Sequence, residues 1–422
     1  MRGENTVIIA CVCLRLLPKL RNRSPAKEFV STLTRFTSLS AEEQKVRGLS
    51  FTPREITQQP NTWTTTLEIF RRHQASLTAF LDEAGLRKSI EKRPAVMLVG
   101  AGTSDYIGQA LVLLLRQAWG CEVSACASTE LLPNLEDYIV PGRRYLWISF
   151  SRSGDSPEGV AVLERAIEQY PEIAHLIVTC NTEAQMIAVC RRAAHSCAVV
   201  LDDAVNDRGL AMTSSFTNMI VMGQCLAHAW SIEEYATVHE RLVRAGRDLL
   251  ETAADVADHA ASLDFDRICF VGSGSLASVA RESALKVLEM TAGQVKTMSE
   301  TVLGLRHGPM AALDVKTLIV CFVSEEKRRA LYARDLLLEI GGKRITGDRI
   351  AIGPASAAAD VAPCCEIYLG IENGISDLYR PVLDVLFGQM LGLFCSVAHG
   401  LKPDTPSPDG VINRVVQPFQ IH

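Results

Sequence analysis

The sequence predicts an α/β fold with two doubly wound, parallel-sheet domains that are related by an internal repeat. Apolar strand patterns alternate with helical patterns along the chain. Each half begins with an apolar strand that runs into a glycine-rich turn, and 422 residues exceed what one hydrophobic core usually serves. Such alternation favours parallel sheets with helices on both faces, in which ligands bind beyond the carboxyl ends of the strands.

The first repeat is predicted from a helical pattern over residues 64–84, which leads into the apolar strand and glycine-rich turn of residues 94–104. Further strands are expected at residues 145–151, 175–180 and 197–201. The segment SPEGVAVLERAIEQY, between the first two of these strands, has a helical period. Its Ser156 and Pro157 suit the N-cap and the first turn of a helix.

The second repeat begins after a long helical stretch that ends near residue 263. Residues 267–290 repeat the strand, turn and helix of the first unit, with VGSGSL at 271–276 answering VGAGTS at 99–104. Residues 317–340 repeat the second strand and helix. Self-similarity of this kind indicates two copies of one structural unit.

These patterns divide the chain into four segments. We expect a loosely ordered extension over residues 1–48, a first domain over 65–245, a second domain over 246–400, and a tail over 401–422 that packs near the active site. The extension holds an apolar run of about ten residues beside basic residues, too short to span a bilayer and without a small-residue cleavage site. A loose extension or an early start codon is therefore favoured over a secretory signal.

Composition narrows the classes of partner. The chain is 48% hydrophobic and 22% charged, which predicts a globular protein with a large core, and its net charge of −5 provides no broad basic field for nucleic acid. The 13 cysteines are scattered through apolar runs, so we expect buried thiols in a reducing cytoplasm. Their spacing with histidine fits no zinc site, and we expect neither a metal nor a membrane partner.

The loop after strand 145–151 predicts a phosphate site. In SRSGDSPEG, Ser151, Ser153 and Ser156 surround Gly154 immediately before a helix. Hydroxyl groups and free backbone N–H groups at a helix N-terminus can bind a phosphate without a lysine. The alternative is a serine-rich turn that only caps the helix.

A second set of donors follows the strand at 94–100. The turn contains Gly102, Thr103 and Ser104, and it should meet the serine loop at the same edge of the sheet. Its G-x-G also resembles a dinucleotide fingerprint, but a third glycine and a suitable acidic residue are not evident, which disfavours a nicotinamide site. The corresponding loop of the second repeat, FVSEEKRR, lacks the S-x-S pattern, so phosphate is expected in the first domain alone.

The second domain carries candidate reactive groups instead. Glu282, Lys286 and Glu289 are spaced i, i+4 and i+7 in a helical pattern, which places them on one face. A solvated ion pair is the usual reason for such spacing, but the apolar residues between them favour a face that borders a pocket. His307 follows in the loop GLRHGPM, and a lone loop histidine is more often structural than catalytic.

Six ordered motifs resemble the sugar isomerase (SIS) family from about Phe51 to the end. They are GAGTS (100–104), SFSRSGDSPE (149–158), DRGLAMTSSFT (207–217), ARESALKVLEMTAG (280–293), LRHGP (305–309) and PDTPSPDGVINRVVQ (403–417). More narrowly, they are similar to the tagatose-6-phosphate ketose/aldose isomerase branch, which is linked to galactosamine-6-phosphate deamination. More distantly, they resemble the isomerase half of glucosamine-6-phosphate synthase.

This resemblance implies a role for each candidate residue. Phosphate binding falls to Ser104, Ser151, Ser153 and Ser156, with Gly102, Thr103 and Arg152 in the same two loops as further substrate-binding residues. Glu289 corresponds to the enolisation base, and Lys286 and Glu282 to polar residues of the active site. His307 corresponds to the ring-opening histidine, which a neighbouring subunit supplies in the relative. Arg414 falls roughly where that relative has a tail lysine near the sugar.

The resemblance implies an aldose–ketose isomerase and deaminase that converts galactosamine 6-phosphate to tagatose 6-phosphate and ammonia without a cofactor. The expected ligands are hexosamine 6-phosphates or ketohexose 6-phosphates, and the expected assembly is a homodimer or a higher homo-oligomer. A plain isomerase, a glucosamine-6-phosphate deaminase and a non-catalytic sugar-phosphate sensor are the alternatives. Met310 stands where the closer branch is expected to have lysine, which leaves the preferred epimer open.

Overall fold

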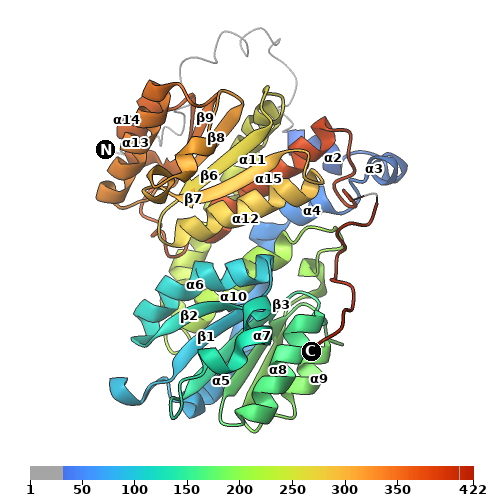
Figure 1. Ribbon diagram of the computed structural model, residues 1–422, viewed down its shortest axis with the longest axis vertical. Coiled ribbons are helices and arrows are strands. Elements are labelled where there is room, and N and C mark those ends of the chain that lie inside the picture. Colours follow the sequence, from blue (N-terminus) through green and yellow to red (C-terminus); the bar gives the residue numbers. More distant parts are fainter. Residues whose placement is uncertain (1–31, 408) are drawn as a thin grey trace, which may run out of the picture.

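Two five-stranded parallel sheets define the fold (Figure 1). The structure is a computed structural model that describes residues 32–407 and 409–422. The strand order is β2-β1-β3-β4-β5 in the first sheet and β10-β9-β8-β6-β7 in the second. When the second sheet is written in the opposite direction, its order is β7-β6-β8-β9-β10. In both sheets the second strand of the set therefore lies at the edge, followed by the first, third, fourth and fifth strands. The predicted α/β fold with two repeated parallel sheets is confirmed.

The first sheet contains β1 (Ala95–Gly100), β2 (Val123–Ala127), β3 (Tyr145–Ser151), β4 (Ala174–Thr179) and β5 (Ser196–Val200). The helices of this half are α5 (Gln59–Ala84), α6 (Thr103–Trp119), α7 (Ser128–Tyr138), α8 (Pro157–Gln169), α9 (Gln185–Cys190) and α10 (Ser214–Ala227). The inner strands β1, β3 and β4 are buried along their whole length, as expected for a parallel sheet covered on both faces.

The long helix α11 (Ile232–Ala261) leads from the first half into the second. The second sheet contains β6 (Arg267–Gly272), β7 (Lys296–Thr301), β8 (Thr317–Phe322), β9 (Arg349–Pro354) and β10 (Ile367–Ile371). Its helices are α12 (Ser275–Met290), α13 (Lys327–Lys343), α14 (Ala358–Val361) and α15 (Pro381–Ala398). Strands β6 and β8 thus fall where the repeated sequence pattern predicts them.

The glycine-rich turns have the same backbone in both halves. Gly102 precedes α6 with φ 55° and ψ −124°, and Gly274 precedes α12 with φ 60° and ψ −130°. Both values lie in a region that side chains other than glycine rarely adopt. Two residues earlier, a Cβ on Gly100 would lie 2.4 Å from the Ser104 carbonyl carbon, so the strand and helix approach closely.

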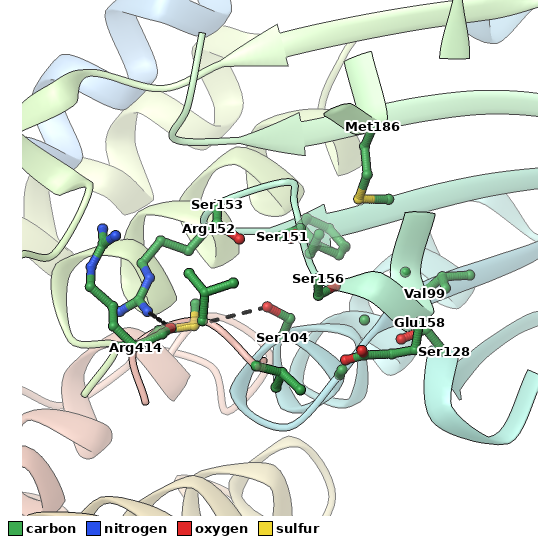
Figure 2. A pocket seen from close by; sticks show the side chains of 17 residues that line it. Val99, Ser104, Ser128, Ser151, Arg152, Ser153, Ser156, Glu158, Met186 and Arg414 are labelled. Carbon is green, nitrogen blue, oxygen red and sulfur yellow. Dashed lines mark hydrogen bonds between the residues drawn. The ribbon is translucent and has the colours of Figure 1, made fainter. Parts of the chain in front are cut away.

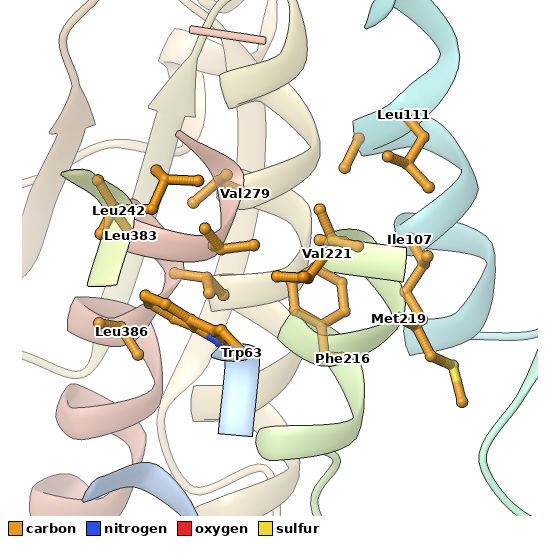
Figure 3. Packing of buried hydrophobic residues seen from close by; sticks show 14 of the residues in the cluster. Trp63, Ile107, Leu111, Phe216, Met219, Val221, Leu242, Val279, Leu383 and Leu386 are labelled. Carbon is orange, nitrogen blue, oxygen red and sulfur yellow. The ribbon is translucent and has the colours of Figure 1, made fainter. Parts of the chain in front are cut away.

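A layer of helices joins the two sheets through a shared hydrophobic core (Figure 3). Trp63 of α5 is fully buried, and its indole N–H donates to Thr217 Oγ1 at 2.9 Å. Figure 3 places it between Leu386 of α15 and Phe216 of α10. Helix α15 is long and apolar enough to cross a membrane, with a mean hydropathy of 1.6, but 89% of it is buried inside the protein. Its apolar sequence is accounted for by its place in the core.

The expectation of a loosely ordered extension is wrong for its last part. Helices α2 (Thr32–Thr37) and α3 (Ala41–Arg47) fold onto the second half of the chain. Phe36 contacts Phe394 of α15 with ring centroids 5.6 Å apart, and Thr32 donates to the Asp255 carboxylate. Helix α2 is stabilised because it buries Leu33 and Phe36, and Phe36 packs against α15. Residues 1–31 lie outside the described residues.

The C-terminal tail runs from the second half down to the first, where it ends near α8 (Figure 1, dark red). At its start, the Asp404 carboxylate accepts backbone N–H bonds from Ser50 at 2.7 Å and Thr52 at 2.8 Å, which caps α4 (Thr52–Thr57). At its end, Arg165 of α8 donates to the carbonyl of His422. The tail therefore bridges both halves.

Candidate active site

A cavity of about 120 Å³ lies at the carboxyl ends of β1 and β3, under the C-terminal tail (Figure 2). It is lined by Val99, Gly100, Ala101, Ser104, Ser128, Phe150, Ser151, Arg152, Ser153, Ser156, Glu158, Gly159, Met186, Met212, Arg414, Val415 and Val416. The four serines predicted from the two loops therefore share one cavity. Gly102 is the N-cap residue of α6 beside it.

The serine loop keeps hydroxyl groups available at the cavity. Ser151 Oγ accepts the Gly154 N–H at 3.0 Å, and Ser153 Oγ accepts the Asp155 N–H at 3.2 Å, so both hydroxyls are oriented by the backbone. Ser156 occupies the predicted N-cap of α8, but its hydroxyl makes no capping bond. A Cβ on Gly159 would lie 2.6 Å from Ser156 Oγ, and this glycine therefore leaves the hydroxyl room.

Two guanidinium groups provide positive charge. Arg152 Nη1 donates to the Leu210 carbonyl at 3.3 Å, and Nη2 donates to the Arg414 carbonyl. Arg414 donates from Nη2 to Asn206 Oδ1 at 2.6 Å. Burial, and then the charge of Arg152, lower the pKa of Arg414 from its usual value. Two partly desolvated cations, serine hydroxyls and two helix N-termini are groups that suit an anion.

A buried carboxylate holds the loop on which Arg414 rests. Asp207 accepts backbone N–H bonds from Thr213 at 2.8 Å, Ser214 at 3.0 Å and Ser215 at 2.9 Å, and it caps α10 in this way. Arg414 Nε donates to the Asp207 carbonyl at 2.7 Å. The DRGLAMTSSFT segment thus positions the tail over the cavity.

Sequence reasoning missed two polar residues of the cavity. Ser128 and Glu158 are 2% and 5% exposed, and Ser128 Oγ and Glu158 Oε2 have no hydrogen-bond partner among the described residues. Ser128 follows β2 directly, at the same sheet edge as Ser151. The rule that carboxyl ends of neighbouring strands converge could therefore have found it.

The predicted acidic and basic residues of α12 form one buried cluster. Lys286 Nζ lies 3.2 Å from Glu282 Oε1 and forms a second ion pair with Glu289 Oε1. The side chains of Lys286 and Glu282 are 1% and 0% exposed, whereas that of Glu289 is 16% exposed. The solvated ion pair considered from the sequence is thus excluded, and Glu289 is the member that reaches the surface.

Burial changes the protonation of this cluster. Burial, against the opposing effect of the Lys286 charge, and with the negative charge of Glu289, raises the pKa of Glu282 to about 8. Burial alone lowers the pKa of Lys286, but the two carboxylates outweigh it and raise that pKa above its usual value. Glu282 therefore takes up a proton more readily than an exposed glutamate, while Lys286 stays charged.

Thr103 connects the cluster with the cavity. Its hydroxyl accepts a hydrogen bond from Lys286 Nζ at 3.0 Å and donates to Glu282 Oε1 at 3.3 Å. The next residue, Ser104, lines the cavity. The first turn of α6 therefore has the serine-lined cavity on one side and the Glu-Lys-Glu cluster on the other.

His307 does not join these groups within the chain. It follows the short 3-10 helix Gly304–Arg306, is exposed, and lies outside the lining of the cavity. In the same loop, Met310 Sδ lies 3.4 Å from the ammonium of Lys343, which comes from the end of α13. An ammonium group is therefore present beside the position where the related branch is expected to have lysine.

The repeated sheet order, the serine-lined cavity after β1 and β3, and the carboxylate–lysine cluster on α12 are those of a protein with two sugar isomerase (SIS) domains. Known proteins are similar to this chain. A D-galactosamine-6-phosphate deaminase AgaS from Escherichia coli is 35% identical over 378 residues, which cover 88% of this chain and 96% of the relative. The chain therefore belongs to the AgaS family.

Solved structures agree with this assignment. The crystal structure of tagatose-6-phosphate ketose/aldose isomerase from Escherichia coli superposes with a TM-score of 0.77 at 33% identity, covering 87% of this chain and 96% of that chain. The C-terminal domain of glucosamine-fructose-6-phosphate aminotransferase from Francisella tularensis shares the fold, with a TM-score of 0.68, 18% identity, and coverage of 86% and 98%. No protein-family model matches the chain.

Proposed function

We propose that the protein is a sugar-phosphate isomerase and deaminase that converts D-galactosamine 6-phosphate and water to D-tagatose 6-phosphate and ammonia. The observation that carries this proposal is the position of Thr103 and Ser104, because consecutive residues contact the carboxylate–lysine cluster and the anion cavity. A hexose phosphate anchored in the cavity would extend its sugar toward Glu289. The AgaS relatives support the choice of an amino sugar.

The cavity is the proposed phosphate site. Hydroxyls of Ser104, Ser151, Ser153 and Ser156 would donate to the phosphate oxygens. Arg152 and Arg414 line the same cavity, and together with the N-termini of α6 and α8 they favour an anion there. Glu158 and Ser128 lie on the other side of it in Figure 2 and offer acceptors to a hydroxyl or a water.

The reaction moves a proton between two carbons. In the open-chain sugar, Glu289 removes the proton from C2, and the electron pair forms a C1–C2 double bond with an oxyanion at C1. The Lys286 ammonium, which already contacts Glu289, stabilises this oxyanion. Return of the proton at C1, together with transfer of a proton from the amino nitrogen to the oxygen on C1, produces an imine at C2. Water adds to the imine carbon, the C–N bond breaks, and ammonia leaves with a ketose phosphate.

Ring opening requires a further proton carrier, and His307 is the proposed one. Its exposed position within the chain fits a histidine that serves the site of a neighbouring subunit, so we propose a homodimer or a higher homo-oligomer. The described cysteines are all free thiols, most of them buried, which supports a cytoplasmic location.

The test measures ammonia release from a panel of 6-phosphates: galactosamine, glucosamine and their N-acetylated forms. The proposal expects the highest kcat/KM with galactosamine 6-phosphate and formation of one ammonia per ketose phosphate. Ketose formation from neutral aldose 6-phosphates without ammonia release from any amino sugar would identify a plain isomerase. Binding without turnover throughout the panel would identify a sensor.

A further inference from the structure

The hydroxyl of Thr103 joins two halves of the chain inside the protein. Thr103 is the first residue of α6 in the first half, and its two hydrogen-bond partners, Lys286 and Glu282, lie on α12 in the second half. All three residues are buried, with 6%, 0% and 0% exposure. Solvent cannot replace this hydroxyl without a local opening of the interface.

Lys286 depends on Thr103 because its ammonium group has three N–H donors and three acceptors. These acceptors are Thr103 Oγ1, Glu282 Oε1 and Glu289 Oε1. Loss of the hydroxyl would leave a charged donor unpaired in a buried site, which is unfavourable. The ammonium would then move toward the carboxylates and away from its present place beside the first half.

Thr103 is also tied to the cavity through the backbone. The Ser104 N–H donates to the Ala101 carbonyl and the Asp105 N–H to the Gly102 carbonyl, both at 3.0 Å. These bonds, together with the left-handed backbone of Gly102, make the turn short and rigid. An anion held by the Ser104 hydroxyl would therefore restrain the adjacent Thr103 as well.

We propose that Thr103 is a positioning residue that couples the binding of a phosphate in the cavity to the position of the Lys286 ammonium and, through it, of Glu289. This inference rests on the proposed phosphate site and adds a route by which binding prepares the chemical step. Thr103 acts through Lys286. A bound phosphate restrains the turn, and the turn holds the ammonium where the oxyanion at C1 forms.

The internal repeat offers a matched control. Ser275 follows Gly274 as the first residue of α12, as Thr103 follows Gly102 in α6. Ser275 is 2% exposed, and its hydroxyl has no hydrogen-bond partner among the residues that the structure describes. Ser275→Ala removes a buried hydroxyl at the equivalent position without removing an interaction with Lys286.

The kinetic test compares Thr103→Val, Thr103→Ser and Ser275→Ala. Valine keeps the shape of threonine without the hydroxyl, so kcat should fall about 10- to 100-fold while KM for the sugar phosphate changes less than about threefold. Thr103→Ser and Ser275→Ala should stay within about threefold of wild type. The alkaline limb of the kcat–pH profile should move to lower pH in Thr103→Val, because the ammonium has lost an acceptor.

Two kinetic results would overturn the inference. A raised KM with unchanged kcat in Thr103→Val would make Thr103 a plain substrate contact. Equal losses in Thr103→Val and Thr103→Ser would show that the hydroxyl is not the operative group.

A second test needs no turnover, and its probe is inorganic phosphate. Phosphate should slow amide hydrogen exchange at the start of α6 and along α12 in wild type, but only at the start of α6 in Thr103→Val. Equal protection of α12 in both proteins would refute the coupling and leave the phosphate site intact. A wild-type protein without protection at α6 would refute the phosphate site itself.

Discussion

The two halves of the molecule have one backbone plan and differ in the loop that follows their third strand. After β3, the serines of the first half surround an open cavity. After β8, Ser324 Oγ donates instead to the carboxylate of Asp377, and the Glu325 N–H donates to Asp377 Oδ1 at 2.8 Å. The buried Arg380 completes this loop by donating to the Val323 carbonyl at 2.7 Å.

This difference shows how two copies of one fold can be suited to two different kinds of site. In the second half, internal carboxylate and guanidinium groups occupy the polar positions that a ligand could take in the first half. The helix that follows the first strand of each sheet also differs between the halves. In the second half this helix is α12, and it carries Glu282, Lys286 and Glu289. One half is therefore suited to anion binding and the other to acid–base chemistry, although their topology is the same.

The substitution with the largest expected effect is in the second half, at the proposed base Glu289. Glu289→Gln keeps the shape of the side chain and removes its basicity, so kcat should fall at least about a hundredfold. Substrate binding should persist because the cavity is unchanged. In deuterated water, wild type should place solvent deuterium next to the product carbonyl, measured by mass spectrometry. Full activity of the variant would remove Glu289 from the mechanism.

The binding half is tested by paired serine variants. Ser153→Ala should raise KM about tenfold or more, because a hydroxyl bonded to a charged group contributes roughly 1.5 to 3 kcal/mol. Ser324→Ala, in the equivalent loop of the second half, should leave KM unchanged and lower the free energy of unfolding by roughly 1.5 to 3 kcal/mol, because Ser324 donates to the Asp377 carboxylate. Steady-state kinetics and urea denaturation separate the two outcomes. A similar rise of KM in both variants would contradict the division between the halves.

In a homodimer, His307 of one subunit is expected to serve the site that contains Glu289 of the other. Glu289→Gln and His307→Ala homodimers should each be nearly inactive, whereas a mixed dimer would have one site with both wild-type residues. Co-refolding at equal ratio should restore about a quarter of wild-type activity, because half of the dimers are mixed and each has one intact site of two. An inactive mixture, with mixed dimers demonstrated by native mass spectrometry, would place His307 in its own chain or outside the mechanism.

The repeat and the helix face of the cluster could be predicted because both depend on local periodicity. Glycine at two fixed offsets after an apolar strand identified both turns, and the i, i+4, i+7 spacing placed Lys286 between two glutamates. The full burial of this cluster could not be predicted, because α12 is covered by α6 and α15. Those contacts join segments more than 90 residues apart in sequence, such as Thr103 and Glu282, for which |i−j| is 179.

The positions of the amino-terminal helices and of the C-terminal tail also could not be predicted from the sequence. Helices α2 and α3 are too short for a clear period, and α2 packs its Phe36 against Phe394 of α15, which lies near the other end of the chain. Ser128 is the first residue of α7, directly after β2, and no glycine or serine cluster surrounds it in the sequence, so no local pattern marked it. Arg414 was located by resemblance, but its contact with Asn206 required the folded tail.

The two sheets also differ in the titratable residue that stands beside the third residue of their third strand, and this difference bears on stability. His175 is the neighbour of Trp147, the third residue of β3, and Arg349 is the neighbour of Ile319, the third residue of β8. The guanidinium of Arg349 is paired with Glu366. The imidazole of His175 is fully buried, and neither ring nitrogen has a hydrogen-bond partner among the described residues. The first sheet thus carries an uncompensated titratable group that the second sheet avoids.

This difference predicts an acid-sensitive first half. Burial lowers the pKa of His175 from 6.5 to about 4, so between these values the unfolded chain binds a proton that the folded protein does not. The stabilising contribution of the neutral ring is complete above about pH 6.5 and is lost as the pH falls toward 4, by about 2 kcal/mol at pH 5. Urea denaturation at pH 7 and pH 5 measures this loss, and His175→Leu, which cannot titrate, should show a smaller decrease by about that amount. Equal pH dependence of wild type and His175→Leu would mean that the imidazole gains a proton, or a partner, within the folded sheet.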